Sequence, residues 1–234
     1  MGVIALLTGR SSYLATRFLL GGAMGEHVWV SSVLGNEASL GVFASTNMTK
    51  EQAIAAVQRN NDGQPVSPDL CPTRIWASSG VEDHEIAFEA RNPDPDLFCA
   101  SSYWIISERA ADVLRQFNLG EGALYPVSEG VFKRDNKTRL PKEYFCWIFG
   151  NTKSAFLSQE SQNVRAPKIE GLWWKMPWTP ADGDVAVSDK ALQGPDVWLD
   201  MMLFNSVFLS GALGDALDSA GLSEAFYLFR CRVI

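Results

Sequence analysis

The sequence predicts an α+β fold in which mixed or antiparallel sheets carry a few short helices. Segments rich in aromatic and β-branched residues, which favour strands, outnumber the segments with helical periodicity. The two kinds of segment do not alternate regularly, as they would in a doubly wound sheet. Near the C-terminus, apolar residues alternate with Leu228, Arg230 and Arg232, which is typical of a half-exposed strand in an antiparallel or mixed sheet.

Local signals mark the ends of the predicted helices. Three segments are expected to be helical: 49–59, 107–118 and 210–220. Thr49 and Gln52 have the spacing of a capping box, and Ser107 is placed to cap the second helix. Gly221 follows the third helix as its stop signal.

The strands and one proline-rich segment predict how the chain is organised. Five segments are expected to be strands: 27–34, 85–90, 102–106, 144–149 and 226–233. Pro93 and Pro95 block both a helix and a central strand, so residues 91–96 are predicted to be a linker. We therefore expect two subdomains, residues 1–92 and residues 97–234. No internal repeat is evident.

Composition and charge narrow the class of partner. The 234 residues are 47% hydrophobic and 20% charged, as in ordinary globular proteins. The net charge of −7, from 27 acidic and 20 basic residues, disfavours direct binding of nucleic acid and suits a basic protein partner. The same charge also serves solubility alone. Basic residues gather at 133–142, where a solvated hairpin tip is favoured over a nucleic-acid contact.

Targeting signals are lacking in the sequence. The apolar run at the N-terminus is short and no positive charge precedes it, unlike a secretory signal. No stretch approaches the roughly 20 apolar residues of a membrane span. We expect a cytoplasmic protein that makes no membrane contact.

Catalytic motifs are also lacking. Nothing around His27 or His84 has the spacing of metal ligands, and no phosphate-binding or nucleophile-elbow glycine motif occurs. The cysteines are widely spaced, which predicts buried free thiols rather than disulfides: Cys71, Cys99, Cys146 and Cys231. We therefore expect no catalytic residue, no cofactor and no metal site.

One region of the chain has the composition of a protein interface. Trp173, Trp174 and Trp178 fall within six residues, and Thr179–Pro195 follows, with three aspartates against the single Lys190. The segment is long for a connection, and exposed tryptophans beside carboxylates suit a binding surface. The predicted partner-binding residues are Trp178, Asp182, Asp184 and Asp189. The alternative is that the tryptophans belong to the core and the segment has no binding role.

The C-terminal two-thirds carries a family resemblance. The segments that carry it are 103–107, 113–114, 125–127, 144–149, 154–157, 197–200, 207–210, 213–222 and 226–233. In the last block, Ser210, a helix and the stop Ala220-Gly221-Leu222 come in the order of the family. The chain thus resembles the immunity proteins encoded beside bacterial polymorphic toxins, a large α+β family first catalogued as a domain of unknown function. It departs from the family pattern at 149–151 and at Phe156.

The resemblance implies a cytoplasmic antitoxin that binds a secreted effector, often of a type VI secretion system, and has no catalytic site itself. Nucleases are frequent toxins and are basic where they meet nucleic acid, so we expect a nuclease blocked by an acidic surface that carries Asp182, Asp184 and Asp189. Two alternatives remain, a scaffold protein of a bacterial complex and a carbohydrate-active hydrolase that uses Glu82 or Asp94. The oligomeric state is not predicted.

Overall fold

The computed structural model describes residues 27–35, 41–43, 45–77, 94–169 and 171–234. The predicted strand 85–90 lies outside these ranges, as do Glu82 and His84. Among the described residues, no helix is both long and apolar enough to cross a membrane.

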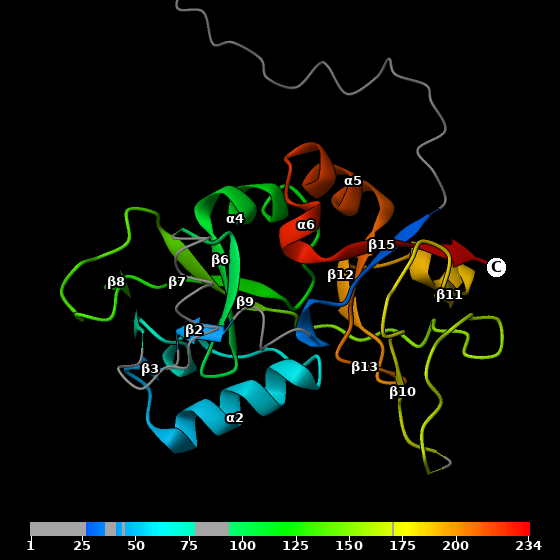
Figure 1. Cartoon of the computed structure of the whole chain (residues 1–234), viewed down its shortest axis with the longest axis horizontal. Coiled ribbons are helices and arrows are strands. Elements are labelled where there is room, and N and C mark those ends of the chain that lie inside the picture. Colours follow the sequence, from blue (N-terminus) through cyan, green and yellow to red (C-terminus); the bar gives the residue numbers. More distant parts are fainter. Residues whose placement is uncertain (1–26, 36–40, 44, 78–93, 170) are drawn as a thin grey trace, which may run out of the picture.

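Two five-stranded sheets organise the fold (Figure 1). The first has the order β2 (Gly41–Phe43), β5 (Leu97–Ala100), β6 (Tyr103–Ser107), β9 (Tyr144–Ile148) and β7 (Ala123–Pro126). The second has the order β11 (Ala186–Val187), β15 (Leu228–Val233), β1 (Val28–Ser31), β14 (Val207–Ser210) and β12 (Val197–Leu199). Both sheets contain parallel and antiparallel pairs, so the predicted α+β class with mixed sheets is confirmed.

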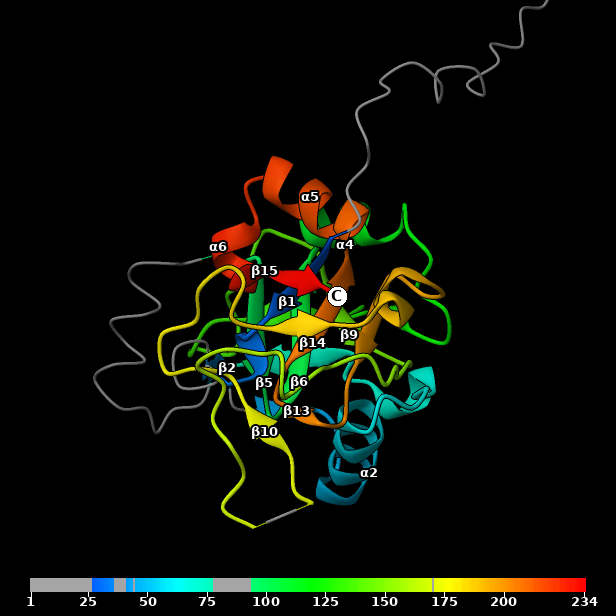
Figure 2. The same ribbon diagram turned by 90° about the vertical axis from the view of Figure 1, so that its right-hand side faces the viewer.

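Smaller elements complete the described part of the chain. A three-stranded sheet is formed by β3 (Ser45–Thr46), β4 (Arg74–Trp76) and β8 (Gly130–Phe132), and a parallel pair by β10 (Trp174–Lys175) and β13 (Leu203–Phe204). The α-helices are α2 (Lys50–Asn61), α4 (Glu108–Leu114), α5 (Gly211–Ser219) and α6 (Ser223–Phe226). The 3-10 turns are η1 (Val33–Gly35), η2 (Pro68–Leu70) and η3 (Asp189–Leu192). Figures 1 and 2 both place α4 and α5 at one end of the molecule and α2 at the other.

The three predicted helices are α2, α4 and α5, and each begins where its capping residue predicts. The Thr49 hydroxyl accepts a hydrogen bond from the Gln52 N–H, and the Gln52 side chain accepts one from the Thr49 N–H, which completes the capping box. Ser107 and Ser210 cap α4 and α5 in the same way. The helix α4 ends at Leu114, earlier than predicted, because the N–H groups of Gln116 and Phe117 bond three residues back instead of four.

Two distant parts of the chain share one backbone plan. Each has a hairpin, a helix that follows the second strand directly, and a return strand: β5–β6–α4–β7 and β12–β14–α5–β15. The N–H of Ser107 donates to the C=O of Asp96, and the N–H of Ser210 donates to the C=O of Asp196, both at 2.9 Å. The structure therefore contains an internal repeat, which the sequence did not reveal because few side chains are identical between the two units.

The strand registers agree between the two units. One residue before the capping serine, Ile106 pairs with Leu97 in the first unit, and Leu209 pairs with Val197 in the second. On the other side, Ser107 pairs with Tyr144 on β9, and Ser210 pairs with Val28 on β1. Thus β9 and β1 hold equivalent places, each between the second hairpin strand and the return strand.

The strands β1 and β9 each lie in the sheet of the unit that does not follow them directly in the chain. The strand β1 precedes the first unit but lies in the sheet of the second, while β9 precedes the second unit but lies in the sheet of the first. In addition, β2 pairs with β5 and β4 pairs with β8. All of these sheets contain strands from both sides of residues 91–96, so they cross the expected subdomain boundary.

One hydrophobic core joins both sheets to the helices α4, α5 and α6. Its large side chains come from β1, β6 and β9 as well as the helices, and include Trp29, Trp104, Trp147 and Phe226. Two further clusters lie on other faces of the sheets: one packs against α2, and the other joins side chains of the second sheet to Ala155, Met176 and Leu203. The four cysteines are buried and free, as predicted.

The helix α5 approaches β1 closely at Gly214. A Cβ added there would lie 2.0 Å from Cδ1 of the buried Trp29 ring. The Trp29 Nε1–H donates to Asp215 Oδ1 at 3.1 Å, which fixes the ring in place. The glycine therefore lets α5 approach β1 closely enough to cover Trp29.

We predict that Gly214→Ala destabilises the protein by about 1–3 kcal/mol, because the methyl group must displace a buried ring in a packed core. This loss outweighs the gain of about 1 kcal/mol in helix propensity. Chemical denaturation measures the difference, and Ser219→Ala, at an exposed position of the same helix, is the control. A Gly214→Ala protein as stable as the wild type would contradict the packing.

Candidate protein-binding surface

Asp184 is not available to a partner. It is only 6% exposed, and its carboxylate accepts hydrogen bonds from Asn163 Nδ2 and from the Ala181 N–H, both at 2.8 Å. Its oxygens thus hold the segment around it in shape. The prediction that Asp184 binds the partner is corrected: the residue is structural.

Asp182 and Asp189 are exposed, as the prediction requires. Asp182 Oδ1 accepts a hydrogen bond from the Arg230 N–H at 2.8 Å and so also ties its turn to β15. Asp189 opens η3, and no hydrogen bond or ion pair of its side chain occurs within the described ranges. The segment Thr179–Pro195 contains β11 and η3 and is therefore more ordered than the loop we expected.

Lys153 anchors the end of this segment. Its Nζ donates to the carbonyl oxygens of Ala191 and Pro195 at 3.2 and 2.9 Å, and lies 3.5 Å from the centre of the Trp198 ring. Burial lowers the pKa of Lys153 to about 8, opposed only in part by Asp196.

The tryptophans differ in exposure. Trp178 is 86% exposed and Trp173 is 41% exposed, whereas Trp174 is half-buried against the core. The Arg165 guanidinium stacks 3.7 Å from the centre of the Trp178 ring, and Arg165 Nε donates to the Met176 carbonyl at 2.7 Å. Trp173 and Trp178 thus belong to the surface and not to the core.

A comparison of the two units shows where this surface gains further apolar groups. Residues 100–103 separate the paired Cys99 and Trp104 in the first hairpin, whereas residues 200–206 separate the equivalent Leu199 and Val207 in the second. The first hairpin closes with a tight turn of two exposed serines. The longer connection of the second contains β13 and exposes Met201, Met202 and Phe204.

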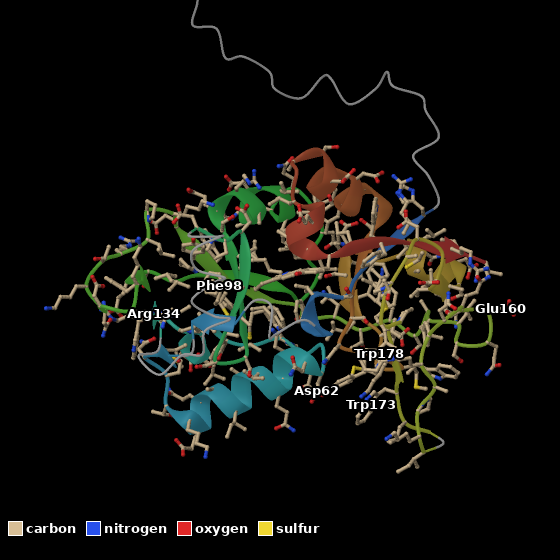
Figure 3. All side chains as sticks on the ribbon, in the orientation of Figure 1. Asp62, Phe98, Arg134, Glu160, Trp173 and Trp178 are labelled. Carbon is tan, nitrogen blue, oxygen red and sulfur yellow. The ribbon has the colours of Figure 1, made fainter. Side chains whose placement is uncertain are left out.

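The exposed side chains form a ridge, which we call the Trp173–Phe204 ridge and which consists of Trp173, Met201, Met202 and Phe204. The rings of Trp173 and Phe204 stack with centres 5.1 Å apart and planes 28° apart. Phe204 belongs to β13 and Trp173 directly precedes β10, its parallel partner, and the Trp174 N–H donates to the Met202 carbonyl at 2.8 Å. Figure 3 shows Trp173 and Trp178 near one edge of the molecule, below the second sheet.

A buried carboxylate fixes the longer connection. Asp200 Oδ2 accepts hydrogen bonds from the N–H groups of Ala155 and Phe156 at 2.7 and 2.8 Å, and Oδ1 accepts one from the Met202 N–H at 3.0 Å. Three charge-assisted hydrogen bonds hold the connection more firmly than a solvated turn would be held. The ridge is therefore displayed on a supported backbone.

Grooves lie on both sides of the ridge, and Trp173 lines each of them. The groove that we call the basic groove holds about 450 Å³ and is lined by Arg165, Ala166, Pro167, Lys168, Ile169, Leu172, Trp173 and Lys175. The other holds about 340 Å³, and its polar lining comes from Asn61, Asp62, Asp200, Asn205 and Ser206. An apolar ridge between two grooves of different charge is suited to bind a shaped protein surface.

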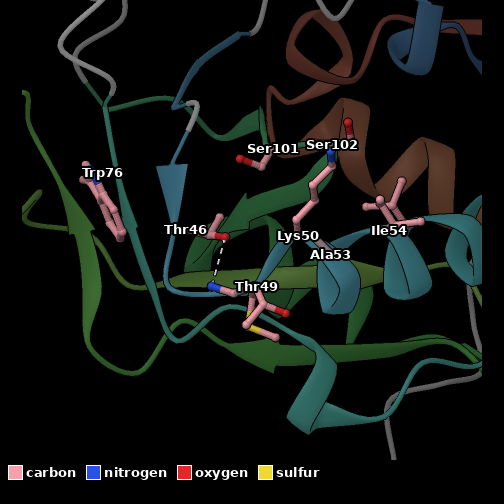
Figure 4. Close-up of a pocket in the computed structure, with 10 residues that line it drawn as sticks. Thr46, Thr49, Lys50, Ala53, Ile54, Trp76, Ser101 and Ser102 are labelled. Atoms are coloured by element: carbon pink, nitrogen blue, oxygen red, sulfur yellow. Dashed lines mark hydrogen bonds between the residues drawn. The ribbon is translucent and has the colours of Figure 1, made fainter.

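A third hollow, of about 480 Å³, lies between α2 and the first hairpin (Figure 4). Lys50 is the only titratable residue among the described residues that line it. Nowhere in the described ranges do three histidine, cysteine or acidic side chains gather as a metal site. The ridge, with its exposed aromatic and methionine side chains, is the stronger candidate for a protein-binding site.

Sequence reasoning found Trp178 but missed the ridge. The tetrapeptide 201–204 is apolar and lies between two strands, so it has the pattern of core. Its exposure depends on the longer second connection, which becomes evident only when the two hairpins are compared.

We predict that Asp184→Ala destabilises the protein by about 1–3 kcal/mol, because two donors lose their acceptor. Asp189→Ala, on the same segment and exposed, should change the free energy of unfolding by less than about 0.5 kcal/mol. Thermal and chemical denaturation measure both values. Equal effects of the two substitutions would contradict the structural role of Asp184.

Lys153 should make stability depend on pH. Its pKa is about 8 in the folded protein and 10.5 for the free side chain. Between these values the unfolded chain binds a proton that the folded chain does not, so this contribution to stability increases as pH rises. The difference in unfolding free energy between wild type and Lys153→Met should therefore grow in favour of the wild type from pH 8 to 10. Lys190→Met, at an exposed position, is the control, and a constant difference for Lys153→Met would contradict the assignment.

The sequence matches no protein-family model, and no curated protein matches it either. The resemblance to immunity proteins, which depends on the C-terminal blocks, accordingly stays a prediction. The ridge and its grooves follow from the geometry of this chain alone.

Proposed function

We propose that this protein is an immunity protein that binds and neutralises a secreted bacterial toxin in the cytoplasm of the cell that makes it. The toxin would be a nuclease effector of a type VI or related secretion system. The protein would act by contact alone and would contribute no catalytic group.

The observation that carries the proposal is the Trp173–Phe204 ridge. Trp173, Met201, Met202 and Phe204 are each more than 40% exposed, and a hydrophobic patch of this kind marks a protein interaction site. The first unit closes the equivalent hairpin with two serines, so the fold does not require apolar residues at this position. Aromatic and methionine side chains are also enriched in interfaces.

Trp178 extends the same surface. Its ring is held by the stacked Arg165 guanidinium, which also lines the basic groove, so the ring is ordered before a partner arrives. Ordering in advance reduces the entropy lost on binding and makes an exposed tryptophan an effective anchor. Asp182 and Asp189 lie further along the chain and are exposed, so they can supply negative charge to a partner.

The proposal is tested by co-expressing the protein with the product of the gene beside its own. We expect that product to be toxic alone, growth to be rescued by this protein, and a stable complex to form. Toxicity that this protein does not relieve would contradict the immunity role. A stable complex with a harmless neighbour would instead favour a scaffold.

Within that complex, Trp173→Ser and Phe204→Ser should each weaken binding by about 30-fold or more, as expected of central anchors. The matched control is Ile54→Ser, which removes an exposed apolar side chain from α2. Calorimetry or surface plasmon resonance gives the dissociation constants. Full affinity in both ridge variants would place the interface elsewhere.

A further inference from the structure

The basic groove has a charge opposite to that of the chain as a whole. Arg165, Lys168 and Lys175 line it, although the net charge of the protein is −7. Among the described lining residues none is acidic, and none of the three cations forms an ion pair with another described residue; Glu170, in the same segment of the sequence, lies outside the described residues. Three cations that have no carboxylate partner within the described part of the chain therefore line one cavity.

Two of these cations lie directly opposite each other. Arg165 and Lys175 form an antiparallel bridge in which their backbones exchange hydrogen bonds of 2.9 and 3.0 Å. Directly opposed residues in such a pair extend their side chains on the same face, and like charges there repel. An anion bound between them would remove the repulsion.

The remaining wall of the groove is apolar. Ile169, Leu172 and Trp173 line it, and Ile169 is 66% exposed. Trp173 is held by its stack on Phe204. The groove thus offers an apolar subsite beside a cationic one, which is a combination that free phosphate or a small dicarboxylate would fill only in part.

We propose that the basic groove binds an acidic segment of the partner protein, with an aliphatic or aromatic anchor against Ile169, Leu172 and Trp173 and flanking carboxylates on Arg165, Lys168 and Lys175. The proposal deepens the proposed function, since it names the chemistry of the toxin segment that docks beside the ridge. Arg165 is held by Trp178 and by the Met176 carbonyl, so it is the preorganised cation, while the two exposed lysines supply additional positive charge.

The groove can be tested without the toxin by selecting a displayed random peptide library on the full-length protein. We expect the enriched peptides to combine Asp or Glu with one large apolar residue. Their affinity should fall at least about tenfold in Lys168→Glu/Lys175→Glu and should weaken with added salt. Both lysines are exposed, so this variant preserves the core.

Lys133→Glu/Lys137→Glu is the matched control, since it makes the same change in net charge at two exposed positions that do not line the groove and should leave peptide affinity unchanged. Enrichment of basic or neutral peptides, or acidic peptides that bind the charge-reversed variant equally well, would overturn the proposal. Failure to enrich any peptide would also overturn it. If the protein dimerises in sedimentation experiments and Trp173→Ser abolishes the dimer, a second copy of the chain occupies the groove instead.

The two proposals fail separately. Acidic peptides that depend on Lys168 and Lys175 would support the groove even if the neighbouring gene product proved harmless. Conversely, rescue from a toxin that binds the charge-reversed variant at full affinity would support the immunity role and exclude the groove.

Discussion

The fold depends on the placement of β1 between β14 and β15. This strand comes from the start of the described chain, and without it the two strands that end the chain would have no central partner. It also brings Trp29 beneath α5, where the ring packs against Gly214 in the core that joins both sheets. Because β9 holds the equivalent place in the first sheet and both sheets share this core, the two units should unfold together.

The internal repeat separates what the fold requires from what it does not. Equivalent positions keep the capping serine, its hydrogen bond to the preceding aspartate carbonyl, and the registers of the hairpin strands. The units differ where residues 100–103 of the first correspond to residues 200–206 of the second. The first hairpin is closed by Ser101 and Ser102. The fold therefore does not require the methionines and the phenylalanine that the longer connection has at the equivalent place. This difference is the physical reason for assigning them to binding.

Features encoded within a few residues were predictable from the sequence, and features that depend on distant contacts were not. Thr49 with Gln52 specified the start of α2, because both partners of a capping box lie within one turn. The pairing of Val28 with Ser210 has no such local signal. Neither the place of β1 in the second sheet nor the combination of strands from both sides of residues 91–96 could therefore be inferred. Asp184 and Asp189 lie in the same acidic segment, yet only the carboxylate of Asp184 accepts hydrogen bonds from Asn163 and the Ala181 N–H, while Asp189 stays exposed.

The opposed charges of the whole chain and of the basic groove act over different distances. A net charge of −7 would attract a basic partner over the roughly 8–10 Å at which salt leaves charges unscreened, and so would affect the rate of encounter with the proposed toxin. The cations of the groove act only on groups within contact distance, and so would affect which segment of the proposed toxin docks. A nuclease has both properties, since it is basic where it holds nucleic acid and carries carboxylates where it holds catalytic metal ions. An acidic chain with one cationic, apolar-walled groove is therefore compatible with a nuclease partner, provided that the docked segment is an acidic one.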